Sequence, residues 1–347
     1  MPLRRRLLGW YRRRRRDLPW RRTTDPYRIW VSEVMLQQTR VATAVPFYQT
    51  FLERFPDVEA LGRAPVSDVL AAWAGLGYYR RARHLHAAAG VVVREHRGLL
   101  PDDPETFARL PGVGRYTTGA VLSMGFGQPL PVLDGNVARV LSRMFMLDAA
   151  VRDPRGAKRL WALAEALVPR RGAGDWNQAL MELGATVCAP RVPQCGRCPV
   201  RALCRAHAAD AVERYPPVPP RRRPQIVRLA AAWIERGGRV LMARREGRLL
   251  EGLWEPPAVE LDGAGRGDRA ALARRLAELG LDVRLVGRAR EIRHLLTHRD
   301  FRVRFWRGTA NGAAPARRAL RWIDPERPGV PLTGLARRLV KSNDGAS

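Results

Sequence analysis

Four cysteines stand close together in the chain, and it contains no others. They are Cys188, Cys195, Cys198 and Cys204, separated by six, two and five residues. A structural zinc site usually has two closely spaced cysteine pairs, whereas this chain has a single C-x-x-C. Disulfides are rare in reducing compartments, and four thiolates suit a 4Fe-4S cluster. We therefore expect these cysteines to hold a 4Fe-4S cluster; a redox role cannot be read from the sequence.

A glutamate lies inside a stretch that is typical of an apolar helix. Pro26 suits the first turn of a helix, and Ile29, Trp30 and Val34 then fall on one face. Glu33 lies within this run. The ionised form of an acid among apolar neighbours is disfavoured, so Glu33 could hold a proton near neutral pH and donate it. A lone glutamate in a helix is more often a surface residue, and that interpretation remains open.

Two glycines at alternate positions predict a tight turn between two helices. Residues 106–110 are typical of the end of a short helix, and Arg115 begins a second one. Gly112 and Gly114 let backbone N–H groups approach an anion, and the start of the second helix favours a phosphate. The pattern therefore predicts a helix-hairpin-helix that binds backbone phosphate. An ordinary connector between helices is the alternative.

A second acid, Asp134, directly precedes a helical run at 137–144. An aspartate in this position is usually a plain N-cap. A chemical role for Asp134 therefore needs independent support.

The charge balance indicates a polyanionic partner. The formal net charge is +29 over 347 residues, and Lys158 and Lys341 are the only lysines, so the excess is almost entirely arginine. Such a charge favours nucleic acid over acidic metabolites. The sequence has no apolar run of about 18 residues and no apolar N-terminal run as long as a signal peptide requires. We expect a cytoplasmic protein without a membrane segment.

The length allows two domains, and the pattern changes between them. Residues 1–214 are mainly helical, with further runs at 157–168 and 176–187, and a Pro/Arg linker follows at 215–225. Residues 226–347 have an α/β pattern. Its expected strands are 226–234, 240–244, 283–286, 290–296 and 301–306, with a helix at 268–279.

Three motifs together resemble one family. The string SEVMLQQT around Glu33, the LPGVG turn and the 6-2-5 cysteine spacing are similar to the MutY family of adenine DNA glycosylases, in the helix-hairpin-helix superfamily of endonuclease III. The resemblance is strong over residues 18–204 and moderate over 226–340. It implies a mainly α helix-hairpin-helix glycosylase domain with a 4Fe-4S cluster loop, followed by an α/β Nudix-like lesion-recognition domain.

The resemblance implies roles for residues around one base pocket. Glu33 would be the acid and base, and Asp134 would stabilise the positive sugar or bond to it. Tyr116 and Asn136 would position Asp134 and the substrate, and Arg21 would help to hold the purine. Bifunctional relatives that also cut the strand have a lysine where this chain has Tyr116, so efficient lyase activity is not expected.

The resemblance also implies DNA contacts. Gln38 and Tyr78 would enter the duplex and fill the space left by an extruded base; the alternative for Tyr78 is a core aromatic residue at a helix end. Thr297 and His298 would recognise 8-oxoguanine, although Leu296 replaces the aromatic residue of the family's Phe-Ser-His turn. An ordinary hairpin turn is the alternative there. The run 270–280 has one glutamate where a Nudix hydrolase needs a cluster of them, so the second domain is expected to read a nucleotide rather than hydrolyse it.

These expectations define a monofunctional adenine DNA glycosylase that acts, as a monomer, on adenine paired with 8-oxoguanine or, more slowly, guanine. Two alternatives remain: a thymine-mismatch glycosylase of the same fold, and a non-catalytic DNA-binding protein that carries a cluster.

Overall fold

The computed structural model describes residues 2–148, 153–217, 224–246, 250–261, 267–296, 299–310 and 319–343. The chain divides into two compact units, which are described separately. The first contains Met1–Pro65 and Arg81–Pro220, and the second contains Val66–Arg80 and Arg221–Ser347. Among the described residues, no helix is long and apolar enough to cross a bilayer.

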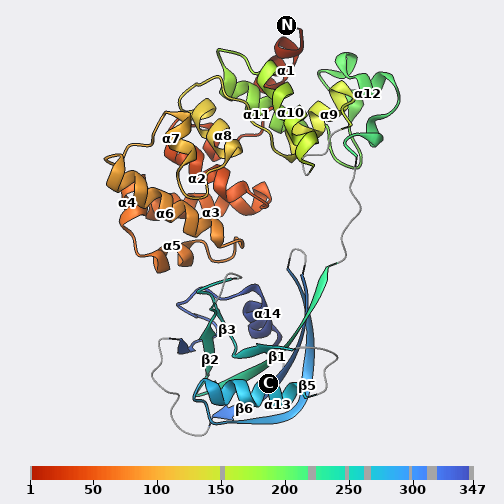
Figure 1. Ribbon diagram of the computed structural model, residues 1–347. Helices are drawn as coiled ribbons and strands as arrows, with labels where there is room; N and C mark the ends of the chain where they lie inside the picture. The colour runs from red at the N-terminus through yellow and green to blue at the C-terminus, as the bar shows by residue number, and fades with distance from the viewer. Residues whose placement is uncertain are drawn as a thin grey trace. The chain divides into compact units, whose positions relative to one another are not determined.

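The first unit is built from helices (Figure 1). Aspartate–proline pairs start three of them, because the aspartate side chain caps the free N–H groups and proline fits the first turn. The helices are α1 (Pro2–Arg14), η1 (Pro19–Arg21), α2 (Pro26–Leu36), α3 (Val41–Arg54), α4 (Val58–Arg63), α6 (Arg80–Glu95), α7 (Pro104–Ala108), α8 (Arg115–Gly125), α9 (Gly135–Phe145), α10 (Pro154–Leu167) and α11 (Ala173–Thr186), followed by the short η2 (Cys195–Arg197), η3 (Arg201–Leu203), α12 (Arg205–Ala208) and η4 (Val212–Arg214).

The N-terminal helix closes the core formed by the later helices. Leu7 and Tyr11 of α1 are fully buried in one cluster with Leu141 of α9 and Trp176 of α11. The guanidinium of Arg4 donates to the carbonyl of Leu167 at 2.9 Å. Because α1 packs along α11, the segment that follows it is brought beside α11.

The second unit contains a seven-stranded mixed sheet with the central order β3-β2-β1-β6-β5; β4 pairs with β1, and β7 pairs with β2. Strand β1 runs parallel to β6, and the other pairs are antiparallel. The elements are α5 (Val66–Ala72), β1 (Gln225–Arg236), β2 (Arg239–Arg244), β3 (Trp254–Glu255), β4 (Ala258–Glu260), α13 (Asp268–Glu278), β5 (Val283–Leu296), β6 (Arg299–Ala310), β7 (Leu320–Ile323) and α14 (Gly334–Asn343).

Helices cover both faces of this sheet. Side chains of β1 alternate between the faces, so Val227 and Leu229 pack with α14, whereas Ala232 and Ile234 pack with α13. The predicted fold class, a helical helix-hairpin-helix domain followed by an α/β Nudix-like domain, is confirmed. The two strands expected within 283–296 form the single strand β5, which is irregular between Val286 and Arg290.

Candidate active site

Helix α2 places Glu33 in an apolar environment. Asp25 caps the helix by accepting from the backbone N–H of Tyr27 at 2.9 Å. Apart from Arg28, the side chains of α2 from Tyr27 to Met35 are buried, and Glu33 is 5 % exposed. This burial raises the pKa of Glu33 to about 7, with a further upward contribution from the charge of Asp134. Glu33 is therefore an acid that can be protonated near neutral pH.

Tyr116, the second residue of α8, is the direct partner of Glu33. Its hydroxyl donates to Glu33 Oε2 at 2.5 Å, and it lies 3.4 Å from the Met181 sulfur. Burial raises the pKa of Tyr116 well above its usual value, and the charge of Glu33 acts in the same direction. The phenol thus remains a hydrogen-bond donor and lowers the pKa of Glu33, opposing part of the effect of burial.

Asp134 is an N-cap, as the simpler interpretation predicts, and it also borders the same cavity as Glu33. Its Oδ1 accepts from the N–H groups of Asn136 at 2.9 Å and Val137 at 2.7 Å. Its Oδ2 accepts from the Asn136 side-chain amide at 2.8 Å. Burial raises the pKa of Asp134, whereas these hydrogen bonds lower it. Capping therefore fixes the orientation of a carboxyl group at the cavity wall.

The cavity has a volume of about 570 Å³, within the range of small-molecule sites. It brings together six of the residues selected from the sequence, namely Arg21, Glu33, Gln38, Tyr116, Asp134 and Asn136. Apolar side chains complete it, including Leu18, Trp20, Ile29, Leu36, Met124 and Met181. A cavity that combines apolar walls with three acids and several other polar side chains suits a planar heterocyclic base.

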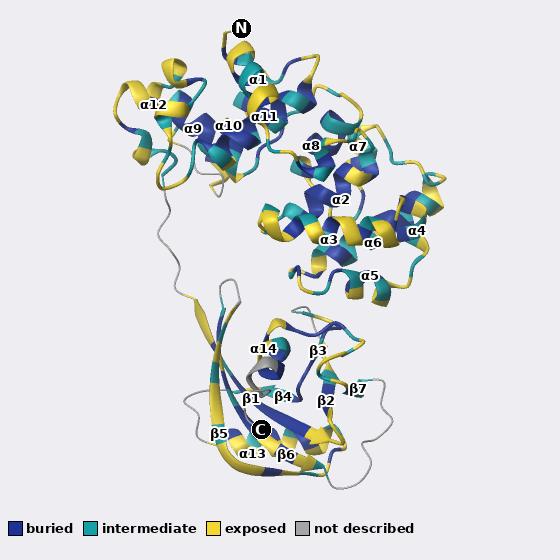
Figure 2. Ribbon diagram, turned by 180° about the vertical axis from the view of Figure 1, so that it is seen from behind, coloured by how far each residue is buried: buried dark blue, intermediate teal, exposed yellow. Residues whose placement is uncertain are grey.

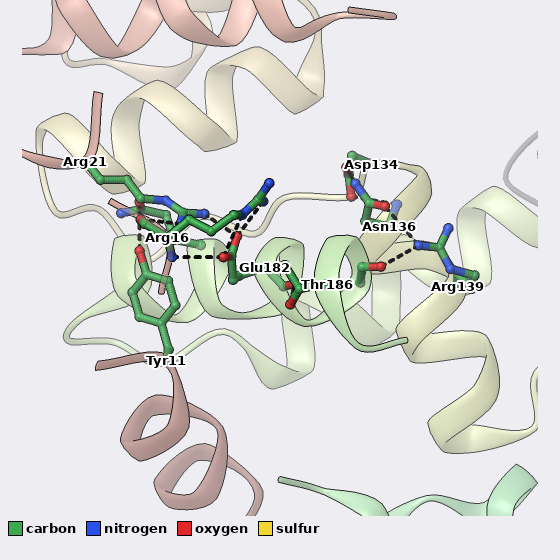
Figure 3. A network of polar contacts seen from close by, with 10 residues as sticks. Tyr11, Arg16, Arg21, Asp134, Asn136, Arg139, Glu182 and Thr186 are labelled. Atoms are coloured by element: carbon green, nitrogen blue, oxygen red, sulfur yellow. Dashed lines mark hydrogen bonds and ion pairs between the residues drawn. The ribbon is translucent and has the colours of Figure 1, made fainter. Parts of the chain in front are cut away.

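Three wall residues, Arg16, Gln178 and Glu182, were not anticipated from the sequence. Glu182 of α11 has no exposed side-chain area, and it accepts from Arg16 Nη2 at 2.7 Å and Arg21 Nη2 at 2.8 Å. Figure 3 shows both guanidinium groups beside this carboxylate. Burial alone would raise the pKa of Glu182, but the two arginines hold it at about 2. An acid in an otherwise apolar helix, the same signal that identified Glu33, could have indicated Glu182.

Arg139 connects the Asp134 side of the cavity to the cysteine loop. Its Nη2 donates to Asn136 Oδ1 at 2.9 Å and to the carbonyl of Gly184 at 2.8 Å. Its Nε donates to the carbonyl of Cys188 at 2.8 Å. Figure 3 shows Asp134, Asn136 and Arg139 in this order at one end of α11. The orientation of Asn136 therefore depends on the backbone at the first cysteine.

All four cysteines, Cys188, Cys195, Cys198 and Cys204, line a second cavity in the first unit. The buried Arg143 holds its wall by donating to the carbonyl of Ala189 at 2.7 Å, and its Nη1 lies 3.3 Å from Cys188 Sγ. Within the described part of the chain, no three His, Cys, Asp or Glu side chains are grouped to hold a metal ion. Cysteines that line a cavity suit a larger inorganic cluster bound by four thiolates, so the donor set fits 4Fe-4S.

The predicted phosphate-binding turn lies between α7 and α8. Gly112 has a φ of +75°, and a Cβ there would lie 2.5 Å from the Cβ of His84, so only glycine fits. Gly114 is the N-cap of α8 and is exposed. The turn therefore presents backbone N–H groups at a helix start, as the helix-hairpin-helix prediction requires.

The two residues expected to enter the duplex share an unusual backbone. Gln38 has a φ of 59° and Tyr78 has a φ of 50°, in the left-handed region that non-glycine residues rarely adopt. Tyr78 belongs to the second unit and is 40 % exposed, which does not favour the core-aromatic alternative. Arg81 fixes the segment around Gln38 by donating to the carbonyls of Met35 at 2.8 Å and Gln37 at 2.5 Å.

The expected lesion-reading residues, Thr297 and His298, lie outside the described residues. The expected scarcity of acids on the Nudix-like helix is observed in α13, where Glu278 is 64 % exposed in its side chain and pairs with Arg275. The structure thus groups the residues expected around the base and leaves the turn at 297–298 as a prediction.

Comparison with known proteins defines the class first. Residues 31–166 match the HhH-GPD superfamily of base excision DNA repair proteins, and residues 230–342 match the NUDIX domain. The chain is 36 % identical over 378 residues to the rat adenine DNA glycosylase, covering 92 % of this chain and 73 % of the rat protein. It is 49 % identical over 209 residues to the human adenine DNA glycosylase, covering 58 % of this chain but 38 % of the human protein.

A solved thermostable thymine-DNA glycosylase is also similar. Its TM-score is 0.55 at 33 % sequence identity, and the match covers 60 % of this chain and 95 % of that one. The extent of the match to the rat protein determines the assignment within the superfamily. The chain belongs to the adenine DNA glycosylase family.

Proposed function

We propose that this protein hydrolyses the N-glycosidic bond of adenine in duplex DNA, where adenine is paired with 8-oxoguanine or, more slowly, guanine. The observation that carries the proposal is that Glu33 and Asp134 border one cavity, with the pKa of Glu33 raised to about 7. A protonated Glu33 can supply the proton that a purine needs in order to leave as a neutral base. The cavity volume of about 570 Å³ supports entry of a single extruded base rather than of the duplex.

The proposed reaction resembles that of a retaining glycosidase. Glu33 donates its proton to N7 of adenine, and the glycosidic bond breaks with its electron pair passing to the base. Asp134, oriented by Asn136, stabilises the oxocarbenium-like sugar or bonds to its anomeric carbon. Water then attacks that carbon, and Glu33 takes a proton from the water, so the protonated form of Glu33 is restored.

The remaining wall residues position these groups. The Tyr116 hydroxyl holds Glu33 by a hydrogen bond, and Glu182 fixes Arg21 at the cavity wall. We propose that Arg21 holds the purine. No lysine lines the described cavity, and Lys158 is exposed on α10. This supports a monofunctional enzyme, for which borohydride should trap little covalent complex with DNA.

We further propose that Cys188, Cys195, Cys198 and Cys204 bind a 4Fe-4S cluster with a structural role. When bound, it would shape the loop from Cys188 to Cys204. Because Arg139 donates to the Cys188 carbonyl and to Asn136, that loop supports the position of Asp134. Lesion recognition is assigned to Thr297 and His298 on the family resemblance.

The test is single-turnover adenine release from duplexes containing A:8-oxoguanine or A:guanine. E33Q should reduce the rate about 10²- to 10⁴-fold, because general acid–base catalysis contributes that much. E95Q, which changes an exposed glutamate at the end of α6, is the matched control and should release adenine at the wild-type rate. Equal rates for E33Q and E95Q would exclude Glu33 as the acid and leave the non-catalytic alternative.

A thymine-mismatch glycosylase is the second candidate, favoured by the likeness to the thymine-DNA glycosylase structure. Thymine has no N7 to protonate, so the buried acid at position 33 favours adenine. Comparing a G:T duplex with an A:8-oxoguanine duplex under the same conditions separates the two. Faster release of thymine than of adenine would reverse the assignment.

A further inference from the structure

Three arginines form a row across the sheet of the second unit. Arg228 of β1 lies opposite Arg302 of β6, and Arg302 lies opposite Arg293 of β5. Directly opposed residues project from the same face of a sheet, so the three guanidinium groups share one face. Like charges placed opposite one another destabilise a sheet. The row is therefore not explained by sheet stability.

Acids near the arginine row (Arg228, Arg293 and Arg302) differ in exposure: Asp300 is buried, whereas Glu291 is 77 % exposed in its side chain and pairs with Arg304 rather than with the row. Asp300 is 4 % exposed, accepts from Arg293 Nε at 2.8 Å and lies 3.8 Å from Arg302 Nε. The side chains of Arg293 and Arg302 are 64 % and 52 % exposed. A guanidinium has five N–H donors, so one carboxylate partner leaves capacity for a second anion. The arginine row is thus bonded to the buried Asp300 and remains accessible to solvent.

A cavity of about 530 Å³ lies over this face and is lined by all three arginines of the row. Arg304 also lines it and bonds to the buried Asp268, the first residue of α13, at 2.9 Å. Helix α13 covers the adjoining part of the same face, where Trp306 is buried. Most of β5 is exposed, as Figure 2 shows. The sheet face is thus open where the arginines lie.

The arginine row also has a defined place along the β5–β6 hairpin. Arg293 precedes Thr297 by four residues, and Arg302 follows His298 by four. At about 3.3 Å per residue, the row lies roughly 10 Å from the Leu296–Arg299 pair, where the described part of the hairpin ends. Neighbouring strands are about 4.8 Å apart, so the row spans roughly 10 Å. That extent suits successive phosphates of a polymer better than one isolated phosphate.

We propose that the arginine row binds the phosphate backbone of duplex DNA beside the base that the 297–298 turn reads. The proposal rests on the proposed function for the identity of its ligand. Arginine forms paired hydrogen bonds to phosphate, and each phosphate neutralised releases counterions. The second unit then contributes sequence-independent affinity in addition to recognition of the lesion.

The test measures the dissociation constant of the full-length, cofactor-loaded protein for undamaged duplex DNA at several salt concentrations. R228Q/R293Q/R302Q should weaken binding roughly 10- to 100-fold and lower the slope of log affinity against log salt by about 2 to 3. The matched control, R236Q/R239Q/R274Q, removes three exposed arginines elsewhere in this unit. It should weaken binding much less, although the net charge changes equally.

A single-arginine variant and a competition experiment complete the test of the arginine row. Arg293 and Arg302 pair with Asp300, whereas Arg228 forms no ion pair within the described ranges, so R228Q tests the arginine row even if the triple variant folds poorly; a slope reduced by about 1 is expected. Equal affinity and slope for the row and control variants would overturn the proposal. So would displacement of DNA from the row by a millimolar nucleoside triphosphate, because the row would then be a nucleotide site. Wild-type protein that binds DNA in this way but releases no adenine would refute the proposed function alone.

Discussion

The cavity of about 570 Å³ has one wall on α2 and another on α11; each wall contains a buried glutamate, and the partners of the two differ. Glu33 of α2 faces a phenol and a second acid, and its pKa is raised to about 7. Glu182 of α11 faces two arginines, and its pKa is held at about 2. Both carboxyl groups lie among apolar residues of a helix. Burial therefore does not decide the charge of either one; the partners do.

The difference assigns separate tasks to the two walls. A permanently ionised Glu182 can fix Arg16 and Arg21 but cannot donate a proton at neutral pH. Glu33 can donate one because no cation among the described residues bonds to it, although the charge of Arg21 still lowers its pKa. Changing the partners of either glutamate should shift its pKa toward that of the other glutamate.

The largest effect is expected from E182Q. Removing one member of a buried ion pair costs about 3 to 5 kcal/mol, because Arg21, 9 % exposed, is left without its carboxylate. Urea denaturation at pH 7 should show this loss of unfolding free energy. E165Q breaks the exposed Arg115–Glu165 pair and should cost less than about 1 kcal/mol. Equal losses in the two variants would mean that the α11 network does not stabilise the fold.

The opposite sign is expected for E33Q. The pKa of Glu33 rises from 4.5 in the unfolded chain to about 7 in the folded one, so its contribution to stability is fully present below pH 4.5 and is lost as the pH rises to 7. Each pKa unit is worth about 1.4 kcal/mol, which gives about 3 kcal/mol. E33Q should therefore be more stable than wild type by up to that amount at pH 8.5, with little difference at pH 4.5. A difference that does not depend on pH would contradict the raised pKa.

The rate of adenine release should follow the protonated fraction of Glu33. Above pH 7 this fraction falls tenfold per pH unit, so single-turnover release should be about 100-fold slower at pH 9 than at its plateau. E182Q should move the descending limb of the pH–rate profile to lower pH. The charge of Arg21 lowers the pKa of Glu33, and in this variant Glu182 would no longer neutralise it. A limb that stays in place in E182Q would show that the two walls are electrostatically independent.

The local sequence pattern indicates both buried acids but not the partners of Glu182. Glu33 could be selected because its apolar helix and the QQT string are local. The interaction of Glu182 with Arg16 joins residues 166 positions apart, and Arg16 is the last of five consecutive arginines that do not differ in pattern. Long-range pairing of this kind depends on how α1 packs against α11, which local periodicity does not specify.

The same limit applies to the second unit. Strand β1 was predictable from its apolar run, whereas its parallel pairing with β6 joins distant segments that have no pattern in common. Strands β3 and β4 are two and three residues long, too short to give a periodic signal. The arginine row follows from this register and therefore could not be read from the sequence.

The smallest effect is expected from Y116F, and its direction is the most informative. The Tyr116 hydroxyl lowers the pKa of Glu33 by donating to its carboxylate, so its removal should raise that pKa further. The descending limb of adenine release should then move to higher pH, opposite to the shift in E182Q. At pH 8.5 the variant should lose less of its plateau rate than wild type, while the plateau itself falls because Glu33 loses the hydrogen bond that orients it. A descending limb of the pH–rate profile displaced to lower pH would mean that the phenol favours the protonated form of Glu33. The raised pKa of Glu33 would then need a different explanation.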